Sequence, residues 1–511
     1  MRAVTAVVRL DFDSVEPEIT FMSETSPAAT AKPWSLLQRM AASSIAASGE
    51  SGCVLIQEGR TALIARLALA RHASQTLDVQ YYLWHDDETG RLLARGLLDA
   101  ADRGVSVRML IDDIHLAGRE TGWAALDRHR NISIRIFNPF RVRAWPSLKR
   151  LVEVIREGGR LNHRMHNKAF IADRSMAIVG GRNIGDEYFA ASPLANFRDM
   201  DLLALGPVVG EISESFETFW NCAYSVSVRT IAPVRPTKRA VRRWTRRLRR
   251  LRLARASLAG YAELAPEQLL GELGKLLQRV HCGHATAIYD LPEKAAGTMS
   301  VAMAGAVRSL ADKVQRELLI ESAYFIPDER TIEALKALRD RGVKVTLLTN
   351  SLASNDVIAA HAGYAVHRRR LLELGINLFE VRSRVARLAS TISGTQAGSQ
   401  ASLHSKAAVL DRKTVFIGTL NFDPRSLYIN TEIGLIVESE GLAKEVGSVI
   451  EQALAGTASF HVRLEPVGQG GAIHWYASTA DSEALADEPE SGWVRKLLSW
   501  IYQRAPIHRW L

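Results

Sequence analysis

One pattern of five residues occurs twice in this chain of 511 residues, with the same internal spacing in both copies. The first copy is His166-x-Lys168-x4-Asp173-x6-Gly180-x2-Asn183, and the second is His404-x-Lys406-x4-Asp411-x6-Gly418-x2-Asn421. Five matched positions within 18 residues, found twice, are not expected by chance. The repeat predicts two similar halves, and a fold that pairs them would bring two histidines and two lysines into one site.

The repeat extends to the segments before each motif. Asp-Arg-Gly-Val occurs at 102–105 and at 340–343, each time between a helical pattern and an apolar run rich in β-branched residues. We expect strands at 77–84, 105–111, 132–137, 318–326, 343–349 and 376–381, with helices at 90–103 and 331–341. This alternation predicts an α/β fold of two similar halves, each a mostly β-sheet core covered by helices on both faces. A pseudo-twofold axis would place the site at their interface.

Each motif is expected to form a hairpin. The residues after the lysine have a strand pattern, an Asp-Arg turn follows, and a second apolar strand returns. Histidine and lysine two positions apart on a strand point to the same face, whereas Asp173 and Asp411 have the opposite parity. We therefore expect these two aspartates to hold the hairpins rather than to touch a substrate.

The bulk composition bounds the class of protein. Hydrophobic residues make up 47% of the chain, and the three cysteines are odd in number and widely spaced, which argues against a disulfide framework. No second Cys/His pair supports a metal site around His281 and His284, so neither a metal nor a cofactor is expected. No apolar run is long enough for a spanning helix, and the acidic N-terminus does not resemble a secretory signal.

Basic residues are concentrated in one segment. Twelve Lys or Arg and no Asp or Glu lie between Arg229 and Arg255, more than the whole net charge of +10. From Lys238 onward apolar residues recur at helical spacing among the arginines, which predicts a basic amphipathic helix. Packing on the body of the protein, docking on anionic lipid and, less favoured, binding nucleic acid all fit this pattern. Tryptophans beside Lys and Arg at the C-terminus pose the same choice between a bilayer interface and core packing.

These patterns divide the chain into five parts. The expected parts are a partly disordered N-terminal extension (1–51), a first half (52–228), a basic amphipathic linker (229–262), a second half (263–462) and a C-terminal tail with a Trp-rich helix (463–511).

The duplicated residues suit chemistry on a phosphodiester. Lys168 and Lys406 would stabilise the charge of a phosphorane-like transition state, and Asn183 and Asn421 would donate hydrogen bonds to it. Thr419 would add a hydroxyl, where its counterpart Gly181 offers only a backbone N–H. One neutral histidine can attack phosphorus while the other, protonated, gives its proton to the departing alcohol.

Each histidine also needs a carboxylate to fix its tautomer. Asp199 and Asp201 follow the first motif and Glu432 follows the second. Because Asp201 and Glu432 both precede apolar strands, we expect these two to face the site from a neighbouring strand. Arg182 and Arg425, next to the motif asparagines, are candidates either for binding a second phosphate or for ion pairs with Asp186 and Asp423.

The two HxKxxxxD motifs, each followed by a GSxN-like turn, resemble the phospholipase D superfamily over about residues 52–462. The resemblance implies metal-independent transfer through a phosphohistidine and a catalytic set of His166, Lys168, Asp173, His404, Lys406 and Asp411. It favours His166 as the nucleophile and His404 as the acid/base, although the opposite assignment also fits the sequence. The departure is Gly181, where the family's serine usually stands.

Within the superfamily, LNHRMHNK at 161–168, GGRNIGDEYF at 180–189 and NFDPRSLYINTE at 421–432 look like bacterial cardiolipin synthases of the C type. The resemblance implies transfer of a phosphatidyl group to phosphatidylglycerol, from phosphatidylethanolamine or a second phosphatidylglycerol. A peripheral enzyme on the cytoplasmic side of the bacterial inner membrane is implied, with anionic and zwitterionic phospholipids as partners and no nucleic acid. A hydrolytic phospholipase D and, less favoured, a phosphodiester-cutting nuclease are the alternatives. Donor lipid, oligomeric state and accessory proteins stay open.

Overall fold

The computed structural model describes residues 34–45, 49–116, 120–142, 157–232, 236–251, 258, 264–297, 302–383, 400–454, 458–467, 470–477 and 484–504. Most of the expected disordered N-terminal extension lies outside these ranges. Within it, Leu36–Ser43 form helix α1, which Ser35 caps by accepting a hydrogen bond from the backbone of Gln38. Across the described ranges, no helix combines the length and apolar character that crossing a bilayer would require.

The first half alternates strands and helices as the sequence predicts. Its elements are β1 (Ser51–Ile56), α2 (Gly59–His72), β2 (Thr76–Tyr81), α3 (Glu88–Asp102), β3 (Ser106–Asp112), α4 (Glu120–Leu126), β4 (Ile132–Phe137), β5 (Ala169–Ala172), β6 (Met176–Gly180), β7 (Ala195–Arg198), β8 (Asp201–Leu205), α6 (Val208–Asn221), β9 (Ser225–Ser227) and α7 (Val228–Ile231).

The second half repeats this order after two helices of the connecting region, α8 (Lys238–Arg249) and α10 (Pro266–Leu277). Its elements are β10 (His281–Tyr289), α11 (Ala302–Lys313), β11 (Glu317–Ser322), α12 (Glu329–Asp340), β12 (Lys344–Asn350), α13 (Ile358–Glu373), β13 (Asn377–Val381), β14 (Gln400–Leu403), β15 (Lys406–Leu410), β16 (Thr414–Gly418), α15 (Pro424–Tyr428), β17 (Ile433–Glu438), α16 (Glu440–Leu454) and β18 (Ser459–Val467). Strand β19 (Gly470–Ala477) and helix α17 (Trp493–Arg504) follow.

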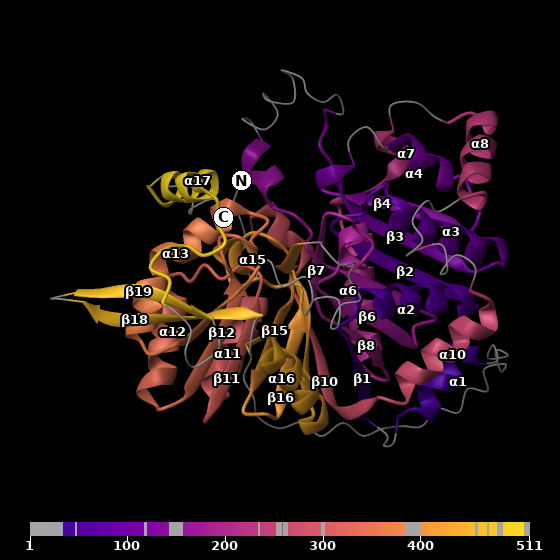
Figure 1. Ribbon diagram of the computed structural model, residues 1–511. Helices are drawn as coiled ribbons and strands as arrows, with labels where there is room; N and C mark the ends of the chain where they lie inside the picture. The colour runs from indigo at the N-terminus through magenta and orange to yellow at the C-terminus, as the bar shows by residue number, and fades with distance from the viewer. Residues whose placement is uncertain are drawn as a thin grey trace, which may run out of the picture. The chain divides into compact units, whose positions relative to one another are not determined.

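The two halves share one sheet of 17 strands. In each half a parallel trio (β2-β3-β4 or β11-β12-β13) continues into antiparallel strands that end at β1 or β10. Strands β1 and β10 then pair antiparallel with each other, Gly52 opposite Cys282. Figure 1 shows the first half in indigo to magenta and the second in orange to yellow, on either side of this junction. The mixed α/β fold of two similar halves is confirmed.

Helices cover both faces of this sheet, and the hydrophobic core is divided accordingly. On the outer face of the first half, α2, α3 and α4 bury the side chains that β2, β3 and β4 direct to that side. On the outer face of the second half, α11, α12 and α13 pack on β11, β12 and β13. A third cluster lies between the halves and joins α6 and α16 to the opposite face of both sets of strands. Apolar burial between the halves therefore holds their facing edges in register.

The two motif aspartates anchor hairpins, as their parity predicts. The Asp173 carboxylate accepts hydrogen bonds from the backbone N–H groups of Ser74, Gln75 and Thr76, at the start of β2. Asp411 accepts the corresponding bonds from Gln315, Arg316 and Glu317, at the start of β11. Both aspartates have positive φ angles, a conformation that Asp tolerates better than most residues. They lie at the hairpin turns and anchor them, as the sequence predicts.

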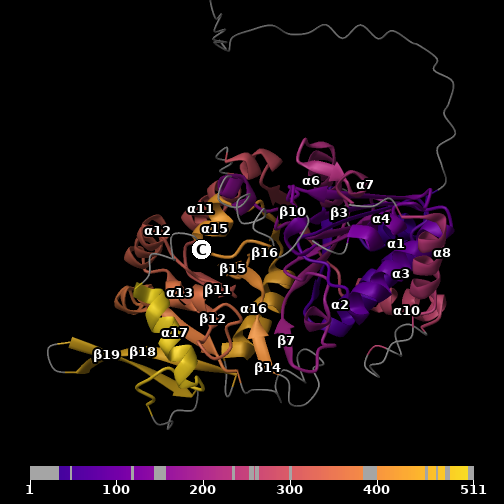
Figure 2. The same cartoon turned by 90° about the horizontal axis from the view of Figure 1, so that it is seen from above.

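The two basic helices are placed differently from each other. Helix α8 directs Trp244 and Leu248 against α3 and α4, while its arginines face outward. Helix α17 packs on α13 and keeps one apolar stripe exposed, with Trp493 at 75% and Trp500 at 52% of their maximal exposure. In Figure 1 both helices lie toward the upper edge of the view, on opposite sides, and Figure 2 shows the same separation from above. Trp510 lies outside the described residues.

Candidate active site

Each motif histidine is held by a carboxylate from the other half. Nδ1 of His166 lies 2.8 Å from Glu432, and Nδ1 of His404 lies 2.7 Å from Asp199. Both histidines are almost buried, and both carboxylates are fully buried. The sequence motif gave no sign of this exchange, because each carboxylate lies downstream of the histidine that it does not contact.

The residue before each carboxylate also contacts the opposite half, through a backbone hydrogen bond. The backbone N–H of His166 donates to the carbonyl of Thr431 at 2.9 Å, and that of His404 donates to the carbonyl of Arg198 at 2.8 Å. In the second case the contact continues as the short parallel pair β14–β7. The two crossing segments thus fix both histidines and both carboxylates together at the interface of the halves.

The hydrogen bond to the carboxylate determines which ring nitrogen is available. A carboxylate accepts a proton from Nδ1, so the Nε2 lone pair of a neutral histidine is free to act as a nucleophile. A protonated histidine in the same position presents Nε2–H as a donor. The arrangement therefore supplies one nucleophile and one acid from the same local geometry.

The two lysines lie beside the histidines and are equally buried. Nζ of Lys168 donates to the carbonyl of His166 at 2.7 Å, and Nζ of Lys406 donates to the carbonyl of His404. Burial lowers the pKa of Lys168 to about 7, against the attraction of Glu432, and it also lowers the pKa of Lys406. An anionic phosphate bound between the two amino groups would raise both pKa values again, because an opposite charge favours the protonated form.

The environments of the two histidines differ. Burial and the charges of Lys168 and Lys406 hold the pKa of His166 well below its usual value. Burial and Lys406 also lower the pKa of His404, but the Asp199 carboxylate acts against them. Of the two rings, His404 is thus the better supported in its protonated form, and His166 is the better held neutral.

The carboxylates that hold the two histidines also differ in their pKa values. Burial alone would raise the pKa of Asp199, but the hydrogen bond and charge of His404, with the charge of Lys406, lower it to about 2. Burial raises the pKa of Glu432 to about 7, in spite of Lys168 and a hydrogen bond from Thr419. Asp199 is therefore ionised at neutral pH, whereas Glu432 titrates there.

The glycines of the motifs are explained by close packing of the strands. A Cβ atom on Gly180 would lie 2.5 Å from Cα of Asp201, and one on Gly418 would lie 2.6 Å from Cα of Gly434. A Cβ atom on Gly181 would lie 2.1 Å from Oδ1 of Asp199. The departure at Gly181 from the family's usual serine therefore leaves room for the carboxylate that holds His404.

The hydroxyl of Thr419 and the amide of Asn183 are engaged within the protein, contrary to their expected contact with phosphate. Thr419 donates to Glu432, and its oxygen accepts the backbone N–H of Ile433. Asn183 accepts from the backbone of Leu83 and donates to the Tyr188 hydroxyl. Oδ1 of Asn421, by contrast, is buried without a hydrogen-bond partner. Of the two asparagines, Asn421 is therefore the one whose amide is left open to a substrate: Oδ1 can accept from a substrate hydroxyl, and the amide nitrogen is the group that can donate to a phosphate oxygen.

The expected role of Asp201 as a histidine partner is wrong. Its carboxylate forms buried ion pairs with Arg66 at 2.9 Å and with Arg182 at 3.3 Å. Arg182 also donates to the carbonyl of Asp199 and so supports the segment that carries the true partner. Asp201 is the first residue of β8, whereas Asp199 lies before that strand, where the chain crosses to the other half.

Aromatic side chains form walls around both histidines, and the sequence motifs did not indicate them. The Tyr82 ring meets the His166 ring edge to face at 5.0 Å, and Tyr188 and Phe197 lie at 5.2 Å and 5.1 Å from the His404 ring. These rings shield the site from water and orient the imidazoles. Tyr82 directly follows β2, Phe197 lies within β7 and Tyr188 lies in a short turn between β6 and β7, so no shared position in the sequence marked them.

Arg425 reaches the site from α15. It donates to the side chain and carbonyl of Asn162 in the other half, and its charge contributes to the lowered pKa of His166. It is half-buried, as a residue binding a substrate phosphate would be. The expected ion pair between Arg182 and Asp186 is replaced by the Asp201 pair described above.

Residues 66–220 and 307–454 match the family described as "Cardiolipin synthase, PLD-like domain". The chain belongs to this family. It is 35% identical over 468 residues to cardiolipin synthase C of Escherichia coli (strain K12), covering 91% of this chain and 96% of that protein. It is 25% identical over 402 residues to cardiolipin synthase A of Pseudomonas fluorescens, covering 78% and 68%.

A solved structure of phosphatidylserine synthase from Haemophilus influenzae Rd KW20 has the same fold, with a TM-score of 0.57 over 91% of this chain and 97% of that chain at 14% identity. Family membership confirms the resemblance drawn from the duplicated motif. It also confirms the expected enzyme class, a phospholipase D-type phosphatidyltransferase.

Proposed function

We propose that this protein makes cardiolipin by transferring a phosphatidyl group from a donor phospholipid to phosphatidylglycerol through a phosphohistidine. The observation that carries the proposal is the pair of imidazoles, each held by a carboxylate of the opposite half, with two buried lysines beside them. Relatives named cardiolipin synthase support the product. The motifs' resemblance to the C type is the ground for proposing phosphatidylethanolamine as the donor.

In the first step, His166 acts as the nucleophile. Its pKa is held low, so the ring is neutral, and Nε2 forms a bond to phosphorus while the bond from phosphorus to the headgroup oxygen breaks. Lys168, Lys406 and Asn421 stabilise the negative charge on the other phosphate oxygens. Glu432 supports the positive charge that develops on the His166 ring.

His404 acts as the acid in this step and as the base in the next. The ionised Asp199 stabilises its imidazolium, and the proton on Nε2 passes to the departing headgroup oxygen, so ethanolamine leaves as an alcohol. His404 then accepts the proton of the phosphatidylglycerol hydroxyl. The oxygen of that hydroxyl bonds to phosphorus as the bond from phosphorus to His166 breaks, which regenerates both histidines.

Two exposed surfaces support attachment to a lipid bilayer. The arginines of α8 that face outward form a cationic patch suited to anionic headgroups, while Trp244 and Leu248 of the same helix are occupied by packing. The exposed stripe of α17, Trp493, Leu497, Trp500 and Ile501, suits the interfacial zone. Because the apolar stripe of α8 is packed against the protein, α8 would contribute charge to membrane binding, and α17 would contribute apolar contact.

Hydrolysis is the alternative for the same catalytic residues, with water in place of the acceptor alcohol. The aromatic walls formed by Tyr82, Tyr188 and Phe197 favour transfer, because they limit the access of water to the histidines. A nuclease would use the α8 arginines to follow a polynucleotide. The exposed tryptophans of α17 favour binding to a bilayer over binding to a polynucleotide.

The test is incubation of the purified protein with labelled phosphatidylglycerol in vesicles, with and without phosphatidylethanolamine. We expect cardiolipin together with released ethanolamine. Released glycerol with cardiolipin would identify phosphatidylglycerol as the donor. Phosphatidic acid as the sole product would replace the proposal with hydrolysis, and cleavage of a labelled oligonucleotide without any lipid product would replace it with a nuclease.

A further inference from the structure

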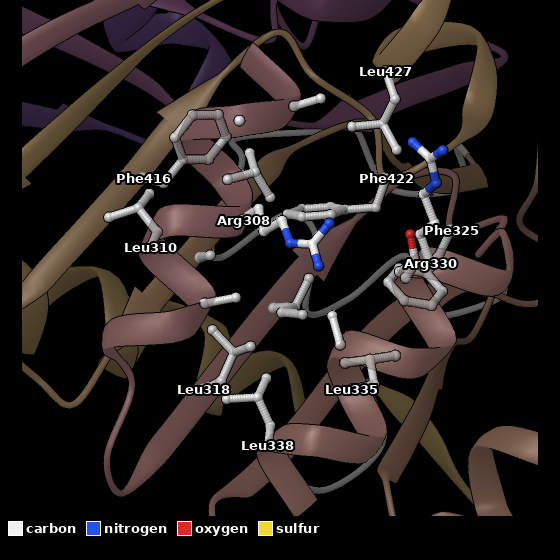
Figure 3. A pocket seen from close by; sticks show the side chains of 18 of the residues that line it. Arg308, Leu310, Leu318, Phe325, Arg330, Leu335, Leu338, Phe416, Phe422 and Leu427 are labelled. Atoms are coloured by element: carbon white, nitrogen blue, oxygen red, sulfur yellow. The ribbon is translucent and has the colours of Figure 1, made fainter. Parts of the chain in front are cut away.

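The second half contains a cavity of about 280 Å³ between α11 and α12, on the outer face of the sheet. Its floor consists of buried apolar side chains from β11, β15, β16 and α12, including Leu318, Leu335, Leu338 and Phe416. Figure 3 shows these leucines around one end of the cavity. An apolar cavity of this size, open to solvent on one side, is not a feature of ordinary close packing.

The corresponding space in the first half, between α2 and α3, is a smaller cavity of about 210 Å³ whose lining includes four charged side chains, Arg71, Arg95, Asp99 and Arg103. There α2 packs closely on α3, so that a Cβ atom on Gly96 would touch Ala70 and Leu67 at 3.7 Å. Ten residues of α2 are buried, whereas Met303 is the one buried residue of α11. Gly305, which lines the cavity from α11, has open space in front of it. The two halves therefore differ in the size and lining of this cavity, which is larger and mainly apolar in the second half.

The rim of the cavity is cationic. Arg308 from α11 and Arg330 from α12 line it from opposite sides, and Figure 3 shows both side chains at the cavity. Arg308 is exposed and has no hydrogen bond or ion pair to any residue that the structure describes. Arg330 lies beside Tyr428, whose hydroxyl donates to Asp328 at 2.7 Å. An apolar interior with arginine at its opening suits an alkyl chain that carries an anionic group.

Two segments of the chain connect the lining of the cavity with the catalytic centre. Phe422, which follows Asn421 of the motif, lines the cavity and meets Phe325 in a backbone bridge and a ring contact of 6.1 Å. Helix α15 carries Arg425 toward the histidines and Leu427 toward the cavity. The cavity rim thus lies within one helical turn of residues that act on the catalytic centre.

We propose that this cavity binds an acyl chain of the acceptor lipid, whose own phosphate rests at Arg308 and Arg330. The inference builds on the proposed function, since it requires a lipid as acceptor. The donor phosphate must lie at the histidines, where it reacts. The phosphate of the acceptor does not react and must be held elsewhere, within the length of its headgroup from His166. The rim arginines and the apolar floor provide that second place.

The first test is binding of hexyl, octyl and decyl phosphate, measured by calorimetry on the whole protein below micelle-forming concentrations. Each added methylene should raise the affinity about fourfold until the cavity is full. Ala334→Phe fills the cavity from α12 and should abolish this chain-length dependence. Ala337→Phe, on the exposed side of the same helix, is the matched control and should keep it. Equal dependence in all three proteins would overturn the proposal.

Arg308→Gln gives a second test that does not depend on the packing of the cavity. It should weaken binding of decyl phosphate and leave binding of the uncharged alkyl chain in decyl maltoside unchanged. Equal loss for both ligands, or loss for neither, would contradict an anionic group at the rim.

The kinetic test compares two acceptors, phosphatidylglycerol in mixed micelles and free glycerol. Ala334→Phe should raise KM for phosphatidylglycerol and leave transfer to glycerol unchanged, because glycerol has no chain to place. An equal loss with both acceptors would overturn the proposal. If the wild-type protein transfers to neither acceptor, the proposed function fails, and the binding of alkyl phosphates still decides whether the cavity takes a chain.

Discussion

Glu432, in the second half of the chain, accepts the Nδ1 proton of His166, in the first half, at a distance of 2.8 Å. The reciprocal contact joins Asp199 of the first half to His404 of the second. Neither half by itself therefore contains a histidine with its supporting carboxylate. The two copies of the motif depend on each other for tautomer, orientation and charge, and not only for proximity.

Exchanging Asp199 for Asn is expected to move the alkaline limb of the kcat/KM profile to lower pH. Loss of a neighbouring negative charge lowers the pKa of His404, so the acid is deprotonated sooner as pH rises. Rates measured between pH 5 and pH 9 check this. Glu432→Gln is the matched control: it should move the acid limb to lower pH and remove the inflection near pH 7 that Glu432 contributes. A shift of the acid limb in Asp199→Asn would exchange the roles of the two histidines.

A donor whose leaving group needs no proton should distinguish the role of the nucleophile from the role of the acid. With a p-nitrophenyl ester of phosphatidic acid, His404→Ala should still release p-nitrophenol in a first turnover, because p-nitrophenolate leaves unprotonated. His166→Ala should release none and form no acid-labile phosphoprotein. Both variants should fail with phosphatidylethanolamine. Phosphoprotein in His166→Ala would show that the nucleophile is a different residue.

Gly181→Ser is expected to disturb catalysis without unfolding the protein. The new Cβ atom would lie 2.1 Å from the Asp199 carboxylate, which must then move away from His404. The variant should lose activity and resemble Asp199→Asn in its pH profile. Gly271→Ser serves as the control, since nothing lies within 4 Å of a Cβ atom at that position. A fully active Gly181→Ser with an unchanged profile would show that Asp199 tolerates the serine.

Asp173→Ala is expected to reduce stability more than chemistry. It leaves three partly exposed backbone N–H groups at the start of β2 without their acceptor, at a cost of about 2 kcal/mol in total, because water replaces part of the lost hydrogen bonds. Denaturant midpoints measure the loss, and kcat per folded molecule should be retained. Asp411→Ala, at a more exposed turn, should cost less. Loss of kcat at full stability would return Asp173 to the catalytic set.

Binding to vesicles should distinguish the two surface helices. Arg242→Gln with Arg246→Gln on α8 should weaken binding to anionic vesicles by about 1 kcal/mol per arginine, and the difference should vanish at high salt. Trp493→Ala with Trp500→Ala on α17 should weaken binding at every salt concentration. Lys336→Gln with Lys344→Gln removes the same charge from the second half and should change little. Equal effects of both lysine and arginine pairs would mean that only net charge matters.

Much of the fold could be predicted because the signals are local. Strand β4 begins at Ile132 and ends at Phe137, as its apolar run predicts, and α3 and α12 lie within two residues of their expected ranges. The parity of Asp173 predicted a place at the turn. Such signals depend only on residues close together in the chain, so the sequence is enough to detect them.

The exchange of carboxylates could not be predicted in the same way. Asp199 and Asp201 are two residues apart, and both precede or begin the same apolar strand, so local pattern favoured the wrong one. What separates them is where the chain crosses to the other half, and that depends on β7 pairing with β14, some two hundred residues later. The cavity between α11 and α12 is likewise invisible to spacing, since it depends on how two helices sit on a sheet.

The sequence by itself determined that two equivalent sets of histidine and lysine exist and that each set is followed by a β-hairpin, since both follow from short-range order repeated twice. The resemblance of the same motifs to a known family indicated the enzyme class. Only the tertiary structure decided which carboxylate holds which imidazole, that Thr419 and Asn183 are occupied within the protein, and that the second half has a mainly apolar cavity. These properties arise from contacts between segments far apart in the chain, where packing and burial, rather than residue spacing, select the partner.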